Sequence, residues 1–193
     1  MDLVPMVFSS GWASGVNAYL VVLVFGIADR VSGFSQVPDA LGRTDVLVAA
    51  AALYAVEFVA DKIPYVDSTW DAVSTVTRPA IGTAIALLVA GDAQTLEQAA
   101  YGVLGGGTAL ASHLVKSGSR LAINSSPEPL SNVAASLGED ITVLGVAVLA
   151  IQHPWVALSV AAVLLVAGLV VLHAVLTLVR RGWRRWKGRP ATG

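Results

Sequence analysis

Residues 57–71, EFVADKIPYVDSTWD, carry five charged side chains directly after residues 46–56, VLVAAAALYAV, which carry none. A helix needs ~20 apolar residues to cross a bilayer, so the uncharged run is too short to span one alone. The helix must extend into the charged stretch if it is to cross. Because Glu57 and Asp61 are four residues apart, they lie on one face of that helix. The stretch therefore predicts a membrane helix with an acidic face at one end.

The whole chain has the composition of a membrane protein. Its 193 residues are 55% hydrophobic and only 13% charged, whereas about a quarter of the residues are charged in soluble domains. Apolar blocks separated by polar stretches predict an all-α integral membrane protein with about six transmembrane helices; the blocks are residues 19–28, 46–56, 79–90, 99–114, 141–151 and 155–179. No linker divides them. We therefore expect one transmembrane domain over residues 1–179 and a basic tail over residues 180–193.

Lysine and arginine concentrate on one side of the predicted helices. Ten of the twelve fall in the second loop, the fourth loop or the tail, and only Arg30 and Arg43 fall on the other side. Basic residues are enriched in cytoplasmic loops, so this pattern predicts that both termini face the cytoplasm. Trp183 and Trp186 are expected to anchor the tail at the interface, where its arginines contact lipid headgroups rather than nucleic acid.

The second and fourth loops have similar helix signals. In the second loop Pro64 ends a helix and residues 68–71, STWD, have the spacing of a capping box. In the fourth loop residues 126–127 and residues 136–139, SLGE, repeat this arrangement. Each loop is predicted to hold a short helix at the cytoplasmic face. Residues 46–90 can also be laid over residues 102–150, which suggests an internal repeat with both copies in the same orientation.

Charged and polar residues in the cytoplasmic halves of the helices form the candidate site. Glu57 and Asp61 face a stripe of opposite sign on the fourth helix, and Arg78 is predicted to face Glu139 and Asp140. A charge in a membrane helix costs at least ~2.5 kcal/mol, so these side chains are expected to point inward. The candidate residues for binding a solute or ion are Asn17, Glu57, Asp61, Asp67, Asp71, Arg78, His113, Lys116, Arg120, Asn124, Glu128, Asn132, Glu139 and Asp140.

Two interpretations of this cluster remain open from the sequence. The charges can neutralise one another and only fix how the helices assemble. Alternatively some of them bind a ligand: Glu57 and Asp61 a cation or proton, and the arginines and Lys116 an anionic group. His113 is the residue best suited to proton linkage, although a single histidine in a membrane helix is more often a packing group.

A divalent metal ion is the one cofactor that the sequence leaves open. Carboxylates are the ligands that Mg²⁺ and Ca²⁺ prefer, and the cluster holds several of them. The chain has no cysteine, which excludes a zinc–thiolate site. It has no glycine-rich phosphate-binding loop and no motif of a hydrolase or metalloprotease.

Three stretches carry a resemblance to a known family. They are GWASGVNAYL at residues 11–20, EFVADKIPYVDSTWDAV at residues 57–73 and NSSPEPLSNVAASLGED at residues 124–140. Together they resemble an uncharacterised bacterial integral membrane family known only as a domain of unknown function. The resemblance implies a small multi-pass protein of the bacterial inner membrane and supplies no activity, substrate or catalytic residue.

The favoured hypothesis is a transporter or flippase-like carrier of a small polar or charged solute, with a charged cavity between helices that opens to the cytoplasm. Helices with polar ends around such a cavity are the expected construction for moving a solute. The alternatives are an oligomeric ion channel, a membrane-embedded metal-dependent enzyme acting on lipid headgroups, and a non-transporting scaffold. An enzyme is the less favoured class. Expected partners are membrane lipids, the solute or ion and further copies of the chain.

Overall fold

The computed structural model describes residues 3–34, 36–124 and 129–187, and within these ranges every regular element is a helix. The elements are α1 (Leu3–Ser32), η1 (Asp39–Gly42), α2 (Thr44–Ala60), α3 (Pro64–Ala90), α4 (Thr95–Asn124), α5 (Pro129–Gln152) and α6 (Pro154–Lys187). This confirms the prediction of an all-helical protein. Four segments are long and apolar enough to cross a membrane: Leu3–Ser32, Tyr65–Ala90, Leu130–Gln152 and Pro154–Arg181.

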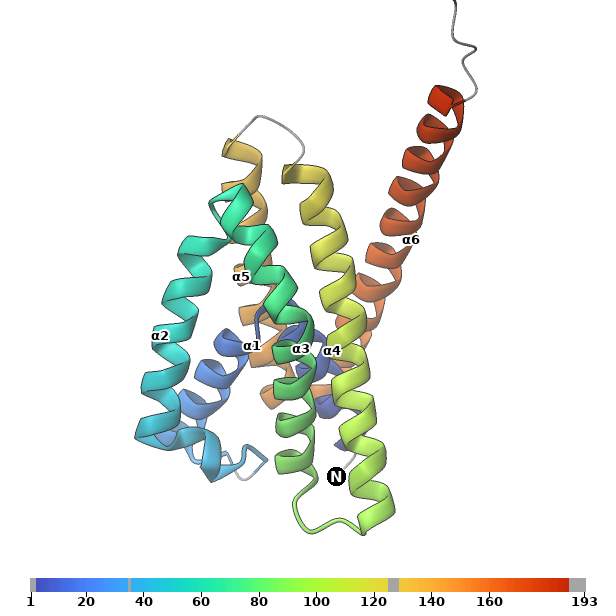
Figure 1. The fold of residues 1–193 in the computed structure, drawn as a ribbon. Helices are drawn as coiled ribbons and strands as arrows, with labels where there is room; N and C mark the ends of the chain where they lie inside the picture. The colour runs from blue at the N-terminus through green and yellow to red at the C-terminus, as the bar shows by residue number, and fades with distance from the viewer. Residues whose placement is uncertain (1–2, 35, 125–128, 188–193) are drawn as a thin grey trace, which may run out of the picture.

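The first helix folds back on itself at Asn17, whose backbone is extended (φ −152°, ψ 94°). Before this break α1 runs parallel to α4, because Gly11 approaches Gly105 and Thr108 while Val16 reaches Lys116. After the break α1 runs parallel to α5, from the contact of Asn17 with Asp140 down to the residues around Ile151. Since α4 and α5 run in opposite directions (Figure 1), α1 is a re-entrant hairpin.

Helices α2–α3 and α4–α5 form two hairpins that run in the same direction, as the suggested repeat requires (Figure 1). The α3–α4 turn and the N-terminal end of α1 lie at the lower end of the bundle in that view. The far end of α6 lies at the upper end. The sequence predicts both termini on the cytoplasmic side, whereas the described ends of α1 and α6 lie at opposite ends of the bundle, because α1 turns back at Asn17.

The residues predicted to form two short loop helices lie in longer helices wherever the structure describes them, and residues 126–127 lie outside the described part of the chain. Pro64 occupies the first turn of α3, a position that needs no backbone N–H, and the helix continues from there to Ala90 with Pro79 inside it. The capping-box residues of the fourth loop, Ser136 and Glu139, lie within α5. These loop sequences therefore do form helix, but the helices do not begin and end where the sequence predicts.

Small residues bring α1 and α4 into close contact. A side chain at Gly15 would collide with Ser112 and with the backbone of Ala109, and one at Gly11 would collide with Thr108 and the backbone of Gly105. On its other side α4 packs on α3, where Gly105 meets the backbone of Gly82. Close approach of backbones is how membrane helices gain packing energy in lipid, which offers no hydrophobic contrast.

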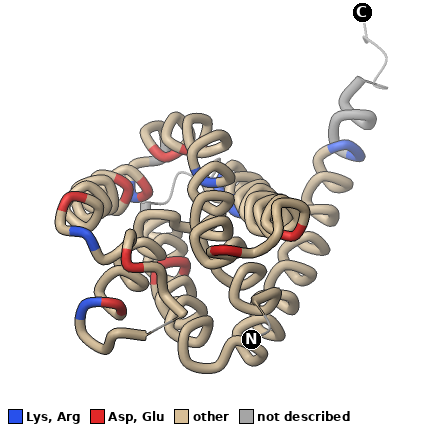
Figure 2. Tube along the Cα trace, turned by 90° about the horizontal axis from the view of Figure 1, so that it is seen from below, with Lys and Arg blue, Asp and Glu red and all other residues tan. Residues whose placement is uncertain are grey.

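The last helix begins in the bundle, where Ala157 and Ala161 are buried, and its C-terminal part stands apart from the other helices (Figure 1). Seen from the lower end, α6 extends away from the other helices (Figure 2). It packs on α4 where Val115 fills the space beside Gly168, yet Val163, Val166 and Val170 are exposed. Of the tail, residues 188–193 lie outside the described part of the chain, as do the side chains of Trp183 and Trp186.

Candidate functional site

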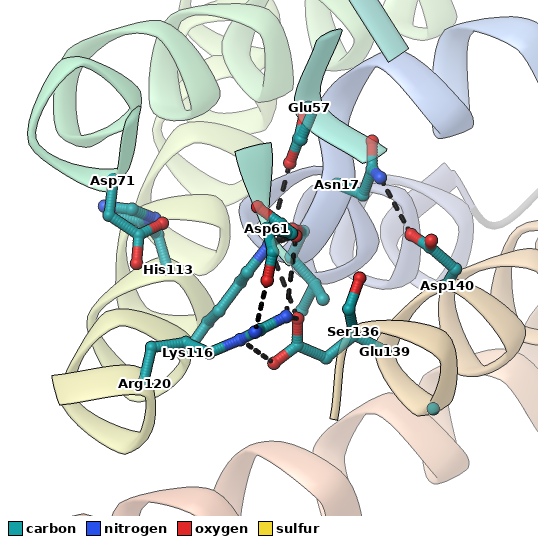
Figure 3. A network of polar contacts seen from close by, with 12 residues as sticks. Asn17, Glu57, Asp61, Asp71, His113, Lys116, Arg120, Ser136, Glu139 and Asp140 are labelled. Carbon is teal, nitrogen blue, oxygen red and sulfur yellow. Dashed lines mark hydrogen bonds and ion pairs between the residues drawn. The ribbon is translucent and has the colours of Figure 1, made fainter. Parts of the chain in front are cut away.

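Seven charged side chains form one buried network in the upper half of the bundle (Figure 3). Arg78 pairs with Glu57 at 2.6 Å, and Lys116 pairs with Asp61 at 2.8 Å. Further pairs link the whole set, which consists of Glu57, Asp61, Asp71, Arg78, Lys116, Arg120 and Glu139. The predicted pairing of the acidic stripe of α2 with the basic stripe of α4 is therefore present.

Helical spacing explains how these side chains meet. Glu57 lies on the last turn of α2 and Asp61 caps its end, so both carboxylates point the same way. On α4 Lys116 and Arg120 lie one turn apart and face them. Asp71 and Arg78 are two turns apart on the continuous helix α3, so they too share a face, and their side chains lie 3.5 Å apart.

Two cations of the network also bind the break in α1. Arg78 Nη1 donates to the carbonyl of Gly15 at 3.2 Å, and Lys116 Nζ donates to the carbonyl of Val16 at 3.1 Å. These carbonyls end the first half of α1, where the helix dipole favours positive charge. The network thus holds an irregular backbone segment within the bundle.

Asn17 completes the break from the other side. Its Oδ1 accepts from the backbone N–H of Leu20 at 3.0 Å, which caps the second half of α1. Its Nδ2 donates to Asp140 Oδ1 at 3.0 Å. One amide therefore both starts the returning helix and ties it to α5, which gives the predicted site residue Asn17 a definite structural role.

The contacts of His113 fix its protonation state. Nδ1 lies 2.9 Å from Arg78 Nη1, and because a guanidinium can only donate, Nδ1 must accept. Nε2 lies 3.0 Å from Thr75 Oγ1, whose own proton is donated to the carbonyl of Asp71. Nε2 therefore carries the proton and the ring is neutral. In this arrangement His113 orients Arg78, and protonating it would break the bond to Arg78.

Arg120 ties α4 to α5 and to the end of α2. Its Nε and Nη2 donate to the two carboxylate oxygens of Glu139 at 3.0 and 2.7 Å. Its Nη1 donates to Asn132 Oδ1 at 2.6 Å and to the carbonyl of Asp61 at 3.0 Å. All of its donor nitrogens are thus bound within the protein.

Pockets open on two sides of the network. One of about 270 Å³ lies between α1, α4, α5 and α6, with Lys116 and Glu139 among its lining residues together with Ser112, Ser119 and Thr142. Another of about 210 Å³ lies between α3 and α4 and is lined by Asp71 and Arg120. Glu139, with 21% of its side chain exposed, is the most accessible member of the network.

Most of the candidate residues lie in or beside this network, and a few do not. Arg78 pairs with Glu57 and Asp71 rather than with the predicted Glu139 and Asp140. Asp67 is buried on α3. Glu128 and the side chain of Asn124 lie outside the described part of the chain.

Neutral partners were missed by the sequence reasoning. Ser112 Oγ donates to the carbonyl of Trp12 at 2.7 Å, and Thr75 contacts His113. Lys62 Nζ reaches Ser136 Oγ at 3.4 Å and lies over the ring of Phe58. Ser112 could have been found from its spacing, because it lies one turn before Lys116 on the same face of α4.

The metal hypothesis gains no geometric support. Among the described residues no three acidic, histidine or cysteine side chains are grouped so that they could hold a metal ion. Four of the carboxylates, those of Glu57, Asp61, Asp71 and Glu139, pair instead with arginine or lysine.

No curated protein and no solved structure matches the chain. A family model does match, over residues 4–174. The chain belongs to the family described as Domain of unknown function (DUF4126).

Proposed function

We propose that the protein is a membrane carrier of a small polar or charged solute, which binds in the pocket between α4 and α5 beside Lys116 and Glu139. The observation that carries the proposal is the part-exposed carboxylate of Glu139, which lines this pocket and belongs to the buried ion network. A group in that position is reachable by a solute and coupled to every helix that the network joins.

The break in α1 also supports the carrier proposal. Irregular backbone at membrane depth is tolerated where protein covers it or where it lines a cavity. Trp12 and Val16, on the last turns before the break, line the pocket that contains Glu139. Discontinuous helices whose ends meet charges beside a binding site are a recurrent construction of transporters.

We infer that the upper end of the bundle faces the cytoplasm of the bacterial inner membrane. The C-terminal turns of α6, which carry most of the basic residues of the tail, lie at this end, whereas Arg30 and Arg43 belong to the lower end, where Arg30 bonds to the carbonyl of Gly42. The ion network and the pocket beside it then lie in the cytoplasmic half of the bundle, and the N-terminal end of α1 lies on the opposite side. The exposed apolar face of α6 is expected to contact lipid or another copy of the chain.

The scaffold is the competing function that a specific observation favours. Each of the three cations in the network makes at least one ion pair of 2.8 Å or less. Charges that are paired in this way can have a purely structural role, in which they fix how the helices assemble. This alternative predicts that no solute moves.

Uptake into proteoliposomes separates the two functions. The purified protein is reconstituted and tested with labelled amino acids, small carboxylates and alkylamines. We expect one of these classes to move, and we expect Glu139→Gln to abolish the flux while Asp45→Asn, a change at the exposed lower end, leaves it intact. Absence of flux for all three classes, or flux that does not depend on Glu139, would overturn the carrier proposal.

A further inference from the structure

The buried network carries more negative than positive charge. It links four carboxylates, those of Glu57, Asp61, Asp71 and Glu139, to three cations. One negative charge is left in excess, in a region where water is scarce. An uncompensated buried charge is costly in free energy, so one further positive charge would stabilise the network.

Asp71 is the least compensated of the four carboxylates. Its only ion pair or hydrogen bond through the carboxylate, among the described residues, is the 3.5 Å contact with Arg78 Nη1. Its Oδ1 is buried and accepts no hydrogen bond. Arg78 Nη1, the atom that faces Asp71, already donates to the carbonyl of Gly15 and to His113 Nδ1, and Nη2 donates to Glu57 at 2.6 Å. The excess charge is therefore localised at Asp71, whose side chain is only 7% exposed.

Asp71 lines the pocket of about 210 Å³ between α3 and α4, together with the hydroxyl residues Ser68, Thr75 and Ser117. Thr75 donates its proton to the carbonyl of Asp71 at 3.0 Å, and Ser117 donates to the carbonyl of Leu114 at 3.4 Å. With their protons used in this way, Ser117 Oγ has its lone pairs left to offer, and Thr75 Oγ1, which also accepts the Nε2 proton of His113, has one left. Carboxylate and hydroxyl oxygens are hard ligands that suit a small cation.

Arg120 also lines this pocket, and an anion site has to be considered for that reason. The donor nitrogens of Arg120 are all bound to Glu139, Asn132 and Asp61, so none is left for an anion. A carboxylate on the opposite wall would also repel an anion. The charge and the available atoms both favour a cation.

We propose that the pocket between α3 and α4 binds one small monovalent cation of the Na⁺ or K⁺ type, with Asp71 as its charged ligand. A single carboxylate and a single excess negative charge match one monovalent ion, whereas Mg²⁺ and Ca²⁺ sites generally draw on more than one charged oxygen ligand. The pocket has room for the ion and for water that completes its coordination. Binding neutralises the network and strengthens the contacts of Arg78 with Glu57 and the break in α1.

Thermal unfolding of the full-length protein in detergent tests the site. N-methyl-D-glucamine chloride is replaced stepwise by NaCl, and separately by KCl, at constant pH and ionic strength. Because an ion that binds only the folded state raises the Tm, we expect a saturable rise with at least one of the two salts. Asp71→Asn should raise the half-saturating concentration about tenfold or more, a difference of ~1.4 kcal/mol in binding, and Asp45→Asn should leave it unchanged.

A second variant keeps the test decisive if Asp71→Asn does not fold. Ala72→Leu fills the pocket from an exposed position and keeps the carboxylate, so it should remove the salt-dependent rise in Tm. The proposal is overturned if neither salt gives a saturable rise in the wild-type protein, or if the rise survives both variants. A rise caused by acidification alone would also overturn it, because a proton would then supply the missing charge. No transported solute is needed, so failure here is distinct from failure of the carrier proposal.

Discussion

Two arginine–carboxylate pairs of nearly equal length occupy opposite environments in this protein. Arg43 and Asp45 meet at 2.7 Å at the lower end of the bundle, with 67% and 65% of their side chains exposed. Arg78 and Glu57 meet at 2.6 Å in the network, with 1% and 0% exposed. Water already solvates the first pair, so breaking it changes little. The second pair cannot turn to water when it is broken. The difference shows that burial rather than distance decides how much stability is lost when a pair is broken.

Removing the buried cation gives the largest expected effect. Arg78→Met leaves Glu57 buried beside Lys116 only and leaves the carbonyl of Gly15 without its donor. Loss of one partner of a buried pair typically costs ~3–5 kcal/mol. We expect a fall of that size in the free energy of unfolding, measured by titration with a denaturing detergent in mixed micelles. Arg43→Met serves as the matched control at the exposed pair.

A double variant sharpens this comparison. Replacing a buried pair by apolar residues of similar size is often neutral, so Arg78→Met combined with Glu57→Leu should recover the part of the lost stability that comes from Glu57, while Asp71 still lacks its ion pair with Arg78. If the double variant is as unstable as Arg78→Met alone, the isolated charge of Glu57 is not the cause of the loss.

The next-largest loss of stability is expected where α1 packs on α4. Gly15→Ala places a methyl group against Ser112 and the backbone of Ala109, so the two helices must separate just where Lys116 reaches Val16. Overpacking of this kind costs ~1–3 kcal/mol. Gly107→Ala is the control, because no atom lies within 4 Å of the added carbon, and it should not destabilise the protein. Equal stability of the two variants in the same unfolding titration would contradict the close packing of α1 and α4.

A smaller loss of stability is expected when the side chain that caps the break in α1 is removed. Asn17→Ala removes the acceptor for the N–H of Leu20 and the donor to Asp140. Loss of an N-cap costs ~0.5–2 kcal/mol. We expect a loss within that range and faster hydrogen exchange at Leu20, measured by mass spectrometry. Unchanged exchange at this amide would show that the break does not depend on Asn17.

The exposed pair gives the smallest effect. The Arg43 side chain, through its hydrogen bond, lowers the pKa of Asp45, and both groups remain in contact with water. Asp45→Asn should therefore leave the Tm unchanged at neutral pH in both low and high salt. A clear loss of stability would show that the lower end of the bundle is less solvated than its exposure indicates.

Much of the site could be predicted from helical spacing alone. Glu57 with Asp61 and Lys116 with Arg120 are each four residues apart, so their faces follow directly from sequence. The cost of charge in a membrane then required those faces to point into the bundle, where the four side chains are buried. The structure bears out both steps.

The partners of Arg78 and the path of α1 could not be predicted in the same way. The sequence predicts a short loop helix around residues 68–71 and a separate apolar helix from residue 79, which separates Asp71 from Arg78, although α3 runs continuously through both. The first apolar block, residues 19–28, is too short to cross a bilayer, and Asn17 directly precedes it. Those two features together are the signal for a re-entrant helix, and they become decisive only when the carbonyls of Gly15 and Val16 are seen to bind cations.

The most direct test of the carrier account is whether water reaches the pocket beside Glu139. The chain has no cysteine, so Ser119→Cys introduces a single thiol at the wall of that pocket, and Val163→Cys introduces one on the exposed apolar face of α6. The measurement is labelling by a membrane-impermeant thiosulfonate in inside-out and right-side-out vesicles. The account predicts rapid labelling at position 119 from the cytoplasmic side and none at position 163. Labelling at position 119 only by a lipid-soluble maleimide would contradict it and would leave the network as a structural device.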